Sequence, residues 1–105
     1  MPDHSDALLR AILSMTARLA IPSPQLFQIV APPRGGGSEA QLAAYNMCDG
    51  TKGQSEIAKE LGIDPGSFSR TVARWIEAGV VIRLGEPPKL LHIYPLTKEH
   101  AREGR

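Results

Sequence analysis

The sequence predicts a mainly α-helical α+β fold in which about five helices precede a two-stranded β-hairpin. Up to Gly79, apolar residues recur every three or four positions between helix start and stop signals. After Gly79, the stretches VVIRL and LLHIYPL are rich in β-branched and aromatic residues and flank the turn GEPPK, so residues 80 to 96 should form the hairpin. With 105 residues, 42% hydrophobic and 22% charged, the chain should build one domain around a single modest core.

Two helices are predicted in the first third of the chain. The first begins at Ser5 as its N-cap and carries an apolar stripe spaced four, three and four residues apart: Leu8, Ile12, Met15 and Leu19. A second, short helix should have Ser23 as its cap and Pro24 as its first residue. The stretch APPRGGG that follows has no apolar periodicity and predicts a loop. This loop divides the domain into residues 1 to 37, the N-terminal helices and the loop, and residues 38 to 105, the remaining helices and the hairpin.

Three further helices are predicted before the hairpin. Ser38, with Gln41 three residues later, has the capping-box pattern of a helix start. The stretch GQSEIAKELG predicts a short helix that ends at Gly62. The stretch DPGSFSRTVARWIEAG predicts a longer one, capped by Asp64, begun by Pro65 and ended by its last glycine.

The fifth predicted helix has two faces of different chemistry. One is an apolar stripe that we assign to the core: Phe68, Val72, Trp75 and Ile76. The other is small, hydroxylated and basic: Gly66, Ser67, Ser69, Arg70, Ala73 and Arg74. A helix that enters the DNA major groove needs small residues for close approach, hydroxyls for phosphates and arginine for phosphates or guanine edges. A merely solvated face usually carries Glu and Lys instead, so this face predicts DNA contact.

The spacing around this helix is that of a helix-turn-helix. Ala58 is a small residue where two helices can cross, Gly62 allows a tight turn, and Phe68 would lock the second helix onto the first. With the hairpin directly after it, the unit becomes a winged helix-turn-helix. In this interpretation residues 65 to 78 lie in the major groove, flanked by three further basic residues: Lys52, Arg83 and Lys89.

The stretch QSEIAKELGIDPGSFSRTVARWIEAGVVIR resembles the MarR family of bacterial winged-helix transcriptional regulators. The matching positions include Ile57, Ala58, Leu61, Gly62, Ile63, Ser69, Arg70, Val72, Arg74, Glu77, Gly79 and Val81. The stretch YPLTKEH resembles the segment where the family's last helix begins. The resemblance implies a sequence-specific regulator of transcription, of the repressor type, bound to double-stranded DNA.

A homodimer is expected for two reasons. One protomer offers few basic residues to contact a DNA duplex, and the first two helices carry more apolar residues than so small a core needs. We therefore expect these helices to join two copies, with the fifth helices about 34 Å apart to match successive major grooves.

The net charge of +1 argues against a strongly basic coat for nucleic acid. It also leaves one alternative open, a winged-helix protein-interaction adaptor that does not bind DNA. The sequence leaves a small-molecule effector open but gives no support for one.

No enzyme is predicted. His92 has no neighbouring Asp, Cys or second His, and the run RGGGS lacks the Lys-Ser/Thr of a phosphate loop. Cys48 is the only cysteine and should be a small buried side chain, so neither a cofactor nor a metal is expected. The chain shows neither a secretory signal nor an apolar run of roughly 20 residues, so we expect a cytoplasmic protein without membrane contact.

Overall fold

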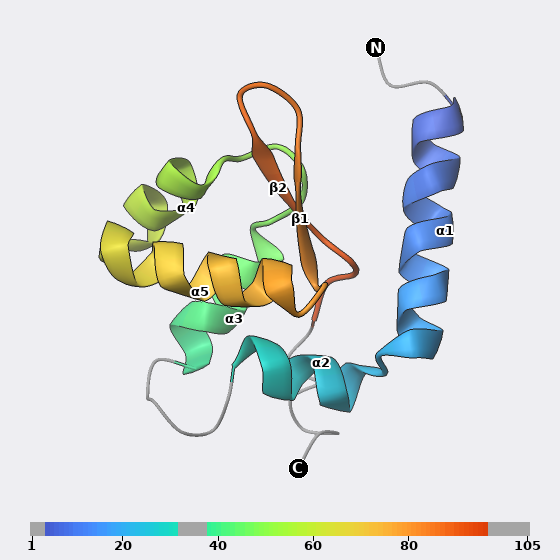
Figure 1. The fold of residues 1–105 in the computed structure, drawn as a ribbon, viewed down its shortest axis with the longest axis horizontal. Helices are drawn as coiled ribbons and strands as arrows, with labels where there is room; N and C mark the ends of the chain where they lie inside the picture. The colour runs from blue at the N-terminus through green and yellow to red at the C-terminus, as the bar shows by residue number, and fades with distance from the viewer. Residues whose placement is uncertain (1–3, 32–37, 97–105) are drawn as a thin grey trace.

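The computed structural model describes residues 4 to 31 and 38 to 96. Within them, five helices precede a two-stranded antiparallel hairpin, which confirms the predicted α+β class (Figure 1). The elements are α1 (His4–Ala20), α2 (Ser23–Val30), α3 (Ser38–Asn46), α4 (Gln54–Leu61), α5 (Pro65–Glu77), β1 (Val81–Leu84) and β2 (Lys89–His92).

The predicted helix starts near the N-terminus were wrong by a residue or two. Helix α1 already includes His4, so Ser5 lies inside its first turn rather than at its cap. Helix α2 begins at Ser23, and its N-cap is Pro22, which has no side chain that could accept a hydrogen bond. The loop expected at APPRGGG and the start of a last helix after residue 96 lie mostly outside the described residues.

The turn between α4 and α5 has the predicted geometry. Gly62 has φ of +66°, the left-handed conformation that favours glycine, and the amide of Ile63 donates to the Ala58 carbonyl at 2.9 Å. At the start of α5, the Asp64 carboxylate accepts a hydrogen bond from the Ser67 amide at 2.9 Å, and Pro65 is the first helical residue. These residues set α5 at a fixed angle to α4.

Strand β2 is hydrogen-bonded on both of its edges. On one edge it pairs with β1, with Val81 opposite His92 and Leu84 opposite Lys89. On the other edge it bonds the chain that leads into α4: the Gly50 amide donates to the Leu90 carbonyl at 2.8 Å, and the Leu90 amide donates to the Lys52 carbonyl at 3.0 Å. The root of the hairpin is therefore tied to the start of α4.

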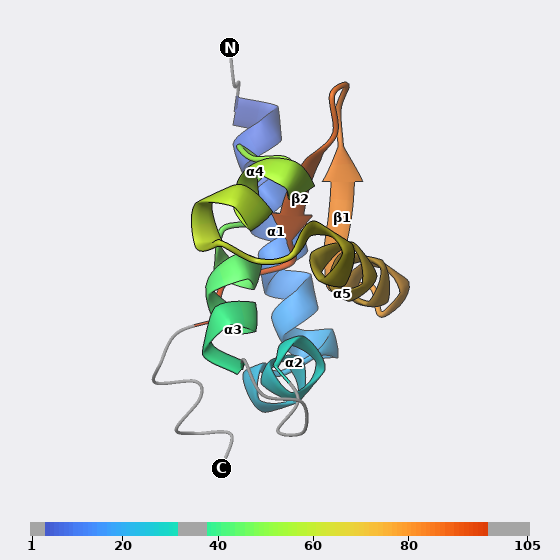
Figure 2. The same cartoon turned by 90° about the vertical axis from the view of Figure 1, so that its left-hand side faces the viewer.

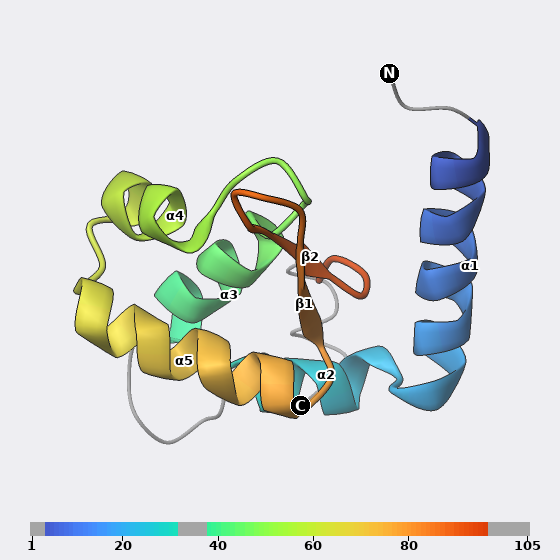
Figure 3. The same cartoon turned by 45° about the horizontal axis from the view of Figure 1, so that its top comes forward.

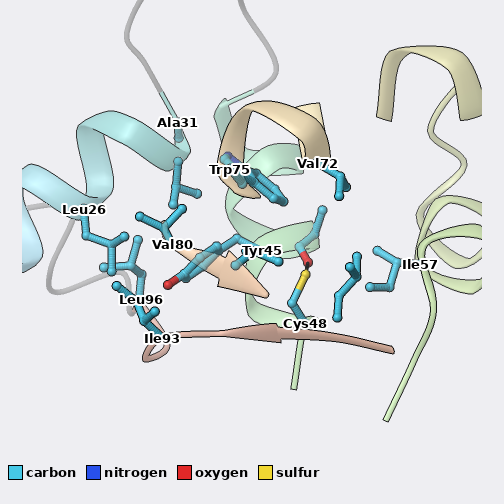
Figure 4. Close-up of a cluster of buried hydrophobic side chains, with 14 of the residues drawn as sticks. Leu26, Ala31, Tyr45, Cys48, Ile57, Val72, Trp75, Val80, Ile93 and Leu96 are labelled. Atoms are coloured by element: carbon cyan, nitrogen blue, oxygen red, sulfur yellow. Dashed lines mark hydrogen bonds between the residues drawn. The ribbon is translucent and has the colours of Figure 1, made fainter. Parts of the chain in front are cut away.

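The core is built around Trp75, which is fully buried (Figure 4). The rings of Tyr45 and Phe68 meet Trp75 edge to face, with centroid distances of 5.7 and 6.1 Å. Cys48 is also fully buried, so both residues lie in the core, as the sequence predicts. Helix α2 belongs to the same core, because its Leu26 has no exposed surface.

Two neighbouring residues of α3 hold the chain that follows β2. The Tyr45 hydroxyl donates to the Tyr94 carbonyl at 2.7 Å. The Asn46 side chain donates to the Leu96 carbonyl at 2.6 Å and accepts from the Leu96 amide at 2.8 Å. These bonds close the core across 49 and 50 residues of chain.

Helix α1 stands at one end of the molecule and touches it along one side only (Figure 1). Ala17 is its one buried residue. Arg10 donates to the Asp49 carbonyl at 3.4 Å, and the Arg18 guanidinium lies 4.5 Å from the centre of the Tyr94 ring. The opposite side carries five large apolar side chains that are 57 to 86% exposed: Leu8, Leu9, Ile12, Met15 and Leu19.

Candidate nucleic-acid interface

Helix α5 exposes every residue of its predicted outward face. The apolar stripe is turned inward, with Phe68, Val72 and Trp75 buried. The exposed residues are Gly66, Ser67, Ser69, Arg70, Ala73 and Arg74. Because a side chain at each of these positions meets solvent, the face is open to a macromolecular partner.

Within the described residues, neither arginine of this face forms an ion pair. Arg70 is held only loosely, through a 3.4 Å hydrogen bond from its Nη2 to the Ser67 hydroxyl. Arg74 is exposed in the next turn. Both guanidinium groups can therefore meet a phosphate or a base without first losing a carboxylate partner.

The first turn of α5 has a structural role that the sequence interpretation missed. Asp64 takes the Ser67 amide, so this amide is not free for a phosphate, and the same hydrogen bond lowers the pKa of Asp64. A Cβ at position 66 would lie 3.3 Å from a carboxylate oxygen of Asp64. Gly66 therefore makes room for the cap as well as for a partner, and Ser67 can offer only its hydroxyl.

The three basic residues predicted to flank α5 lie where the hairpin meets the start of α4. Arg83 on β1 donates from Nη2 to Gln54 Oε1 at 3.5 Å. Lys89, the first residue of β2, forms an ion pair with Glu56, with 3.4 Å between Nζ and Oε1. Lys52 is half-buried in the segment bonded to β2. The sequence had shown these basic residues but not that two α4 side chains, Gln54 and Glu56, bond Arg83 and Lys89.

The Glu56 carboxylate reduces the charge that the hairpin presents. The same Oε1 also accepts from the Gly53 amide at 3.5 Å, which stabilises the start of α4. Two further carboxylates flank the surface, Glu77 at the end of α5 and Glu86 in the hairpin turn, and both are exposed. On α5, by contrast, the positive charge lies on the middle and last turns, at Arg70 and Arg74, and neither forms an ion pair within the described residues.

His92, the last residue of β2, packs against α3. Its ring centre is 5.3 Å from that of Tyr45, and its buried Nδ1 has no hydrogen-bond partner among the described residues. Burial lowers the pKa of His92 below its ordinary value of 6.5, and the neighbouring Arg10 charge acts in the same direction. The imidazole therefore takes up a proton less readily in the folded state than in the unfolded chain.

This burial predicts a pH-dependent stability. The unfolded chain takes up the His92 proton near pH 6.5, above the pKa of the folded state, so the stabilisation is complete above that pH and is lost as the pH falls toward the folded-state pKa. We expect urea unfolding to show lower stability at about pH 5.5 than at about pH 7.5. The His92→Phe variant should lack most of this difference, whereas His4→Phe, at an exposed position, should keep it. Equal losses in wild type and His92→Phe would contradict the assignment.

Comparison of the chain with protein families, curated proteins and solved structures gives no match. Residues 4 to 31 and 38 to 96 contain no group of three or more His, Cys, Asp or Glu placed to hold a metal ion. Over the same ranges, none of the helices has both the length and the apolar character needed to cross a bilayer. A functional proposal therefore depends on the surface formed by α5 and the hairpin.

Proposed function

We propose that this protein is a sequence-specific double-stranded DNA-binding regulator of transcription with a winged helix-turn-helix fold. Helix α5 is the recognition helix and the hairpin is the wing. The observation that carries the proposal is the outward face of α5, which is exposed, small and hydroxylated in its first turns and basic farther along, at Arg70 and Arg74. By resemblance to the MarR-like sequence pattern, the regulator acts as a repressor and as a homodimer.

The face suits the major groove for steric and electrostatic reasons. Gly66 and Ala73 keep the helix surface low, so the backbone can approach the base edges. Arg70, which forms no ion pair within the described residues, can form the bidentate contact with guanine that is the commonest specific contact in the major groove. The Ser69 hydroxyl can bond a phosphate and fix the helix in register.

The test is DNA binding measured by fluorescence anisotropy, after selection of bound fragments from a genomic library. Each protomer offers five basic residues, of which some are paired with other side chains or contact DNA bases rather than phosphates. A plot of the logarithm of the binding constant against the logarithm of the salt concentration should therefore have a slope of about −4 to −7 for a dimer. Unrelated DNA should bind weakly, because the net charge is only +1. Absence of any complex at about 50 mM salt would favour the adaptor alternative. Tight binding to every sequence would instead indicate a coating protein.

The Glu56 carboxylate should weaken the binding of the wing to DNA. In Glu56→Gln the Lys89 ammonium loses its ion-pair partner and can neutralise a phosphate. We expect tighter binding to all sequences alike, with a salt slope steeper by about one. The double variant Glu56→Gln/Lys89→Ala should return to the wild-type slope or below it. An unchanged slope in Glu56→Gln would mean that the wing lysine does not reach DNA.

A further inference from the structure

The exposed stripe of α1 has the spacing of a coiled-coil seam. Leu8, Ile12, Met15 and Leu19 follow one another at intervals of four, three and four, which is the a and d pattern of a heptad repeat. Each of the four is between 57 and 86% exposed. A contiguous apolar stripe of this kind on an otherwise packed domain marks an interaction site.

The residues of α1 that touch the rest of the chain lie on the other side of the helix. Leu13 and Ala17 pack against the core, and Arg10 reaches Asp49. On an α-helix, Ala17 lies about 180° around the axis from the centre of the four-residue stripe, at 100° per residue. Helix α1 can therefore stay on its own domain and still present the whole stripe to a second helix.

We propose that this stripe pairs with the same stripe of a second copy, as an antiparallel two-helix seam. Ile12 then faces Met15 of the partner subunit, and Leu8 faces Leu19 of the partner subunit, so every large side chain of the seam meets another. A two-fold axis makes the contact self-complementary, which closes the assembly at two copies.

The direction of pairing follows from where α5 lies, and this step rests on the proposed function. In Figure 1, α5 lies in the layer nearest the viewer. The turned views agree, because α5 is at the right of Figure 2 and at the bottom of Figure 3, where the front of Figure 1 has moved. An antiparallel seam has its two-fold axis across the α1 helices, along the line of sight of Figure 1. Both copies of α5 then lie on one face of the dimer. A parallel seam would put them on opposite faces, where one straight duplex could not reach both.

The seam also sets the spacing of the two recognition helices. Helix α1 and the first turn of α5 lie at opposite ends of the longest axis of the molecule, which extends 40 Å. Because α5 is about 20 Å long and runs along this axis, its centre lies about 30 Å from α1. A two-fold axis just outside α1 therefore separates the centres of the two α5 helices by roughly 70 Å, which is about two turns of DNA. The spacing of about 34 Å expected from the sequence does not fit a dimer joined on this seam.

Disulfide cross-linking tests both the seam and its direction. Under mild oxidation, Leu8→Cys and Leu19→Cys should each stay monomeric on a denaturing gel, because in an antiparallel seam equal positions are about 16 Å apart. An equal mixture of the two variants should give a covalent dimer. Wild type is the control, since its buried Cys48 should not react. Cross-linking of each variant with itself would indicate a parallel seam and overturn the proposal.

Sedimentation and footprinting complete the test. We expect wild type to be a dimer at tens of micromolar, Ile12→Glu/Met15→Glu to raise the dimer dissociation constant by roughly tenfold or more, and Ala7→Glu, an exposed α1 position off the stripe, to leave it unchanged. Circular dichroism of each variant checks that it folds. Protected DNA segments centred two turns apart would support the seam, whereas one turn would overturn it and leave DNA binding intact. A cross-linked dimer that binds no DNA would keep the seam and contradict the proposed function.

Discussion

Replacing Trp75 with alanine is expected to lower the free energy of unfolding by about 3 to 5 kcal/mol. The side chain is fully buried and lies between the edges of Tyr45 and Phe68. Its loss removes a large apolar surface and leaves a cavity that the rings around it fill only in part. Because a domain of this kind is stable by only about 5 to 15 kcal/mol, the variant should be close to unfolding at room temperature.

Urea unfolding followed by circular dichroism measures this effect, since Trp75 is the only tryptophan and fluorescence is lost with it. Trp75→Phe keeps an aromatic ring in the core and should cost less than Trp75→Ala. Ala73→Gly, on the exposed face of the same helix, is the control for helix propensity and should cost about 1 kcal/mol. If Trp75→Ala cost no more than this control, the packing described for the core would be wrong.

Replacing Arg70 with alanine is expected to weaken specific DNA binding by about 1 to 3 kcal/mol per half-site. This is about 5- to 150-fold in the dissociation constant for each α5 helix. The physical reason is the loss of a planar guanidinium that can donate two hydrogen bonds to one guanine. Titration of the selected DNA fragment against an unrelated fragment of equal length measures the change.

Arg70→Lys separates charge from geometry at the same position. It keeps the positive charge but loses the fork of donors, so the salt slope should stay near the wild-type value while the preference for the selected fragment falls. Neither change should affect folding, because Arg70 is exposed and, within the described residues, is held only by the 3.4 Å hydrogen bond to the Ser67 hydroxyl. If Arg70→Ala binds all DNA as well as wild type, α5 is not the recognition helix.

Much of the fold could be predicted because local chemistry determines it. Gly62, Asp64 and Pro65 act within one turn of their own positions, so the end of α4 and the start of α5 follow from a few letters. The change of apolar period after Gly79 likewise places the hairpin. The start of α1 was less predictable, because several polar residues near it could serve as the N-cap and the helical pattern does not distinguish between them.

The contacts that shape the candidate surface could not be predicted in the same way. The ion pair between Glu56 and Lys89 joins residues 33 positions apart, and no local pattern shows that α4 and β2 meet there. The composition of α1 showed an excess of apolar residues, but only the fold shows that Leu13 and Ala17 face the core while the heptad stripe faces away. Sequence periodicity gives the faces of a helix and leaves open which face its own chain covers.

The bonds from α3 to the chain after β2 also constrain the order in which the protein can fold during synthesis. Asn46 leaves the ribosome long before its backbone partner at Leu96, which follows 50 residues later. Until that segment emerges, Tyr45 lacks its hydrogen-bond partner and the aromatic centre of the core stays uncovered on that side. Closing a loop of this length is also entropically unfavourable. The helices made first must therefore remain loosely collapsed, and the domain completes its core only when the chain has been translated beyond Leu96.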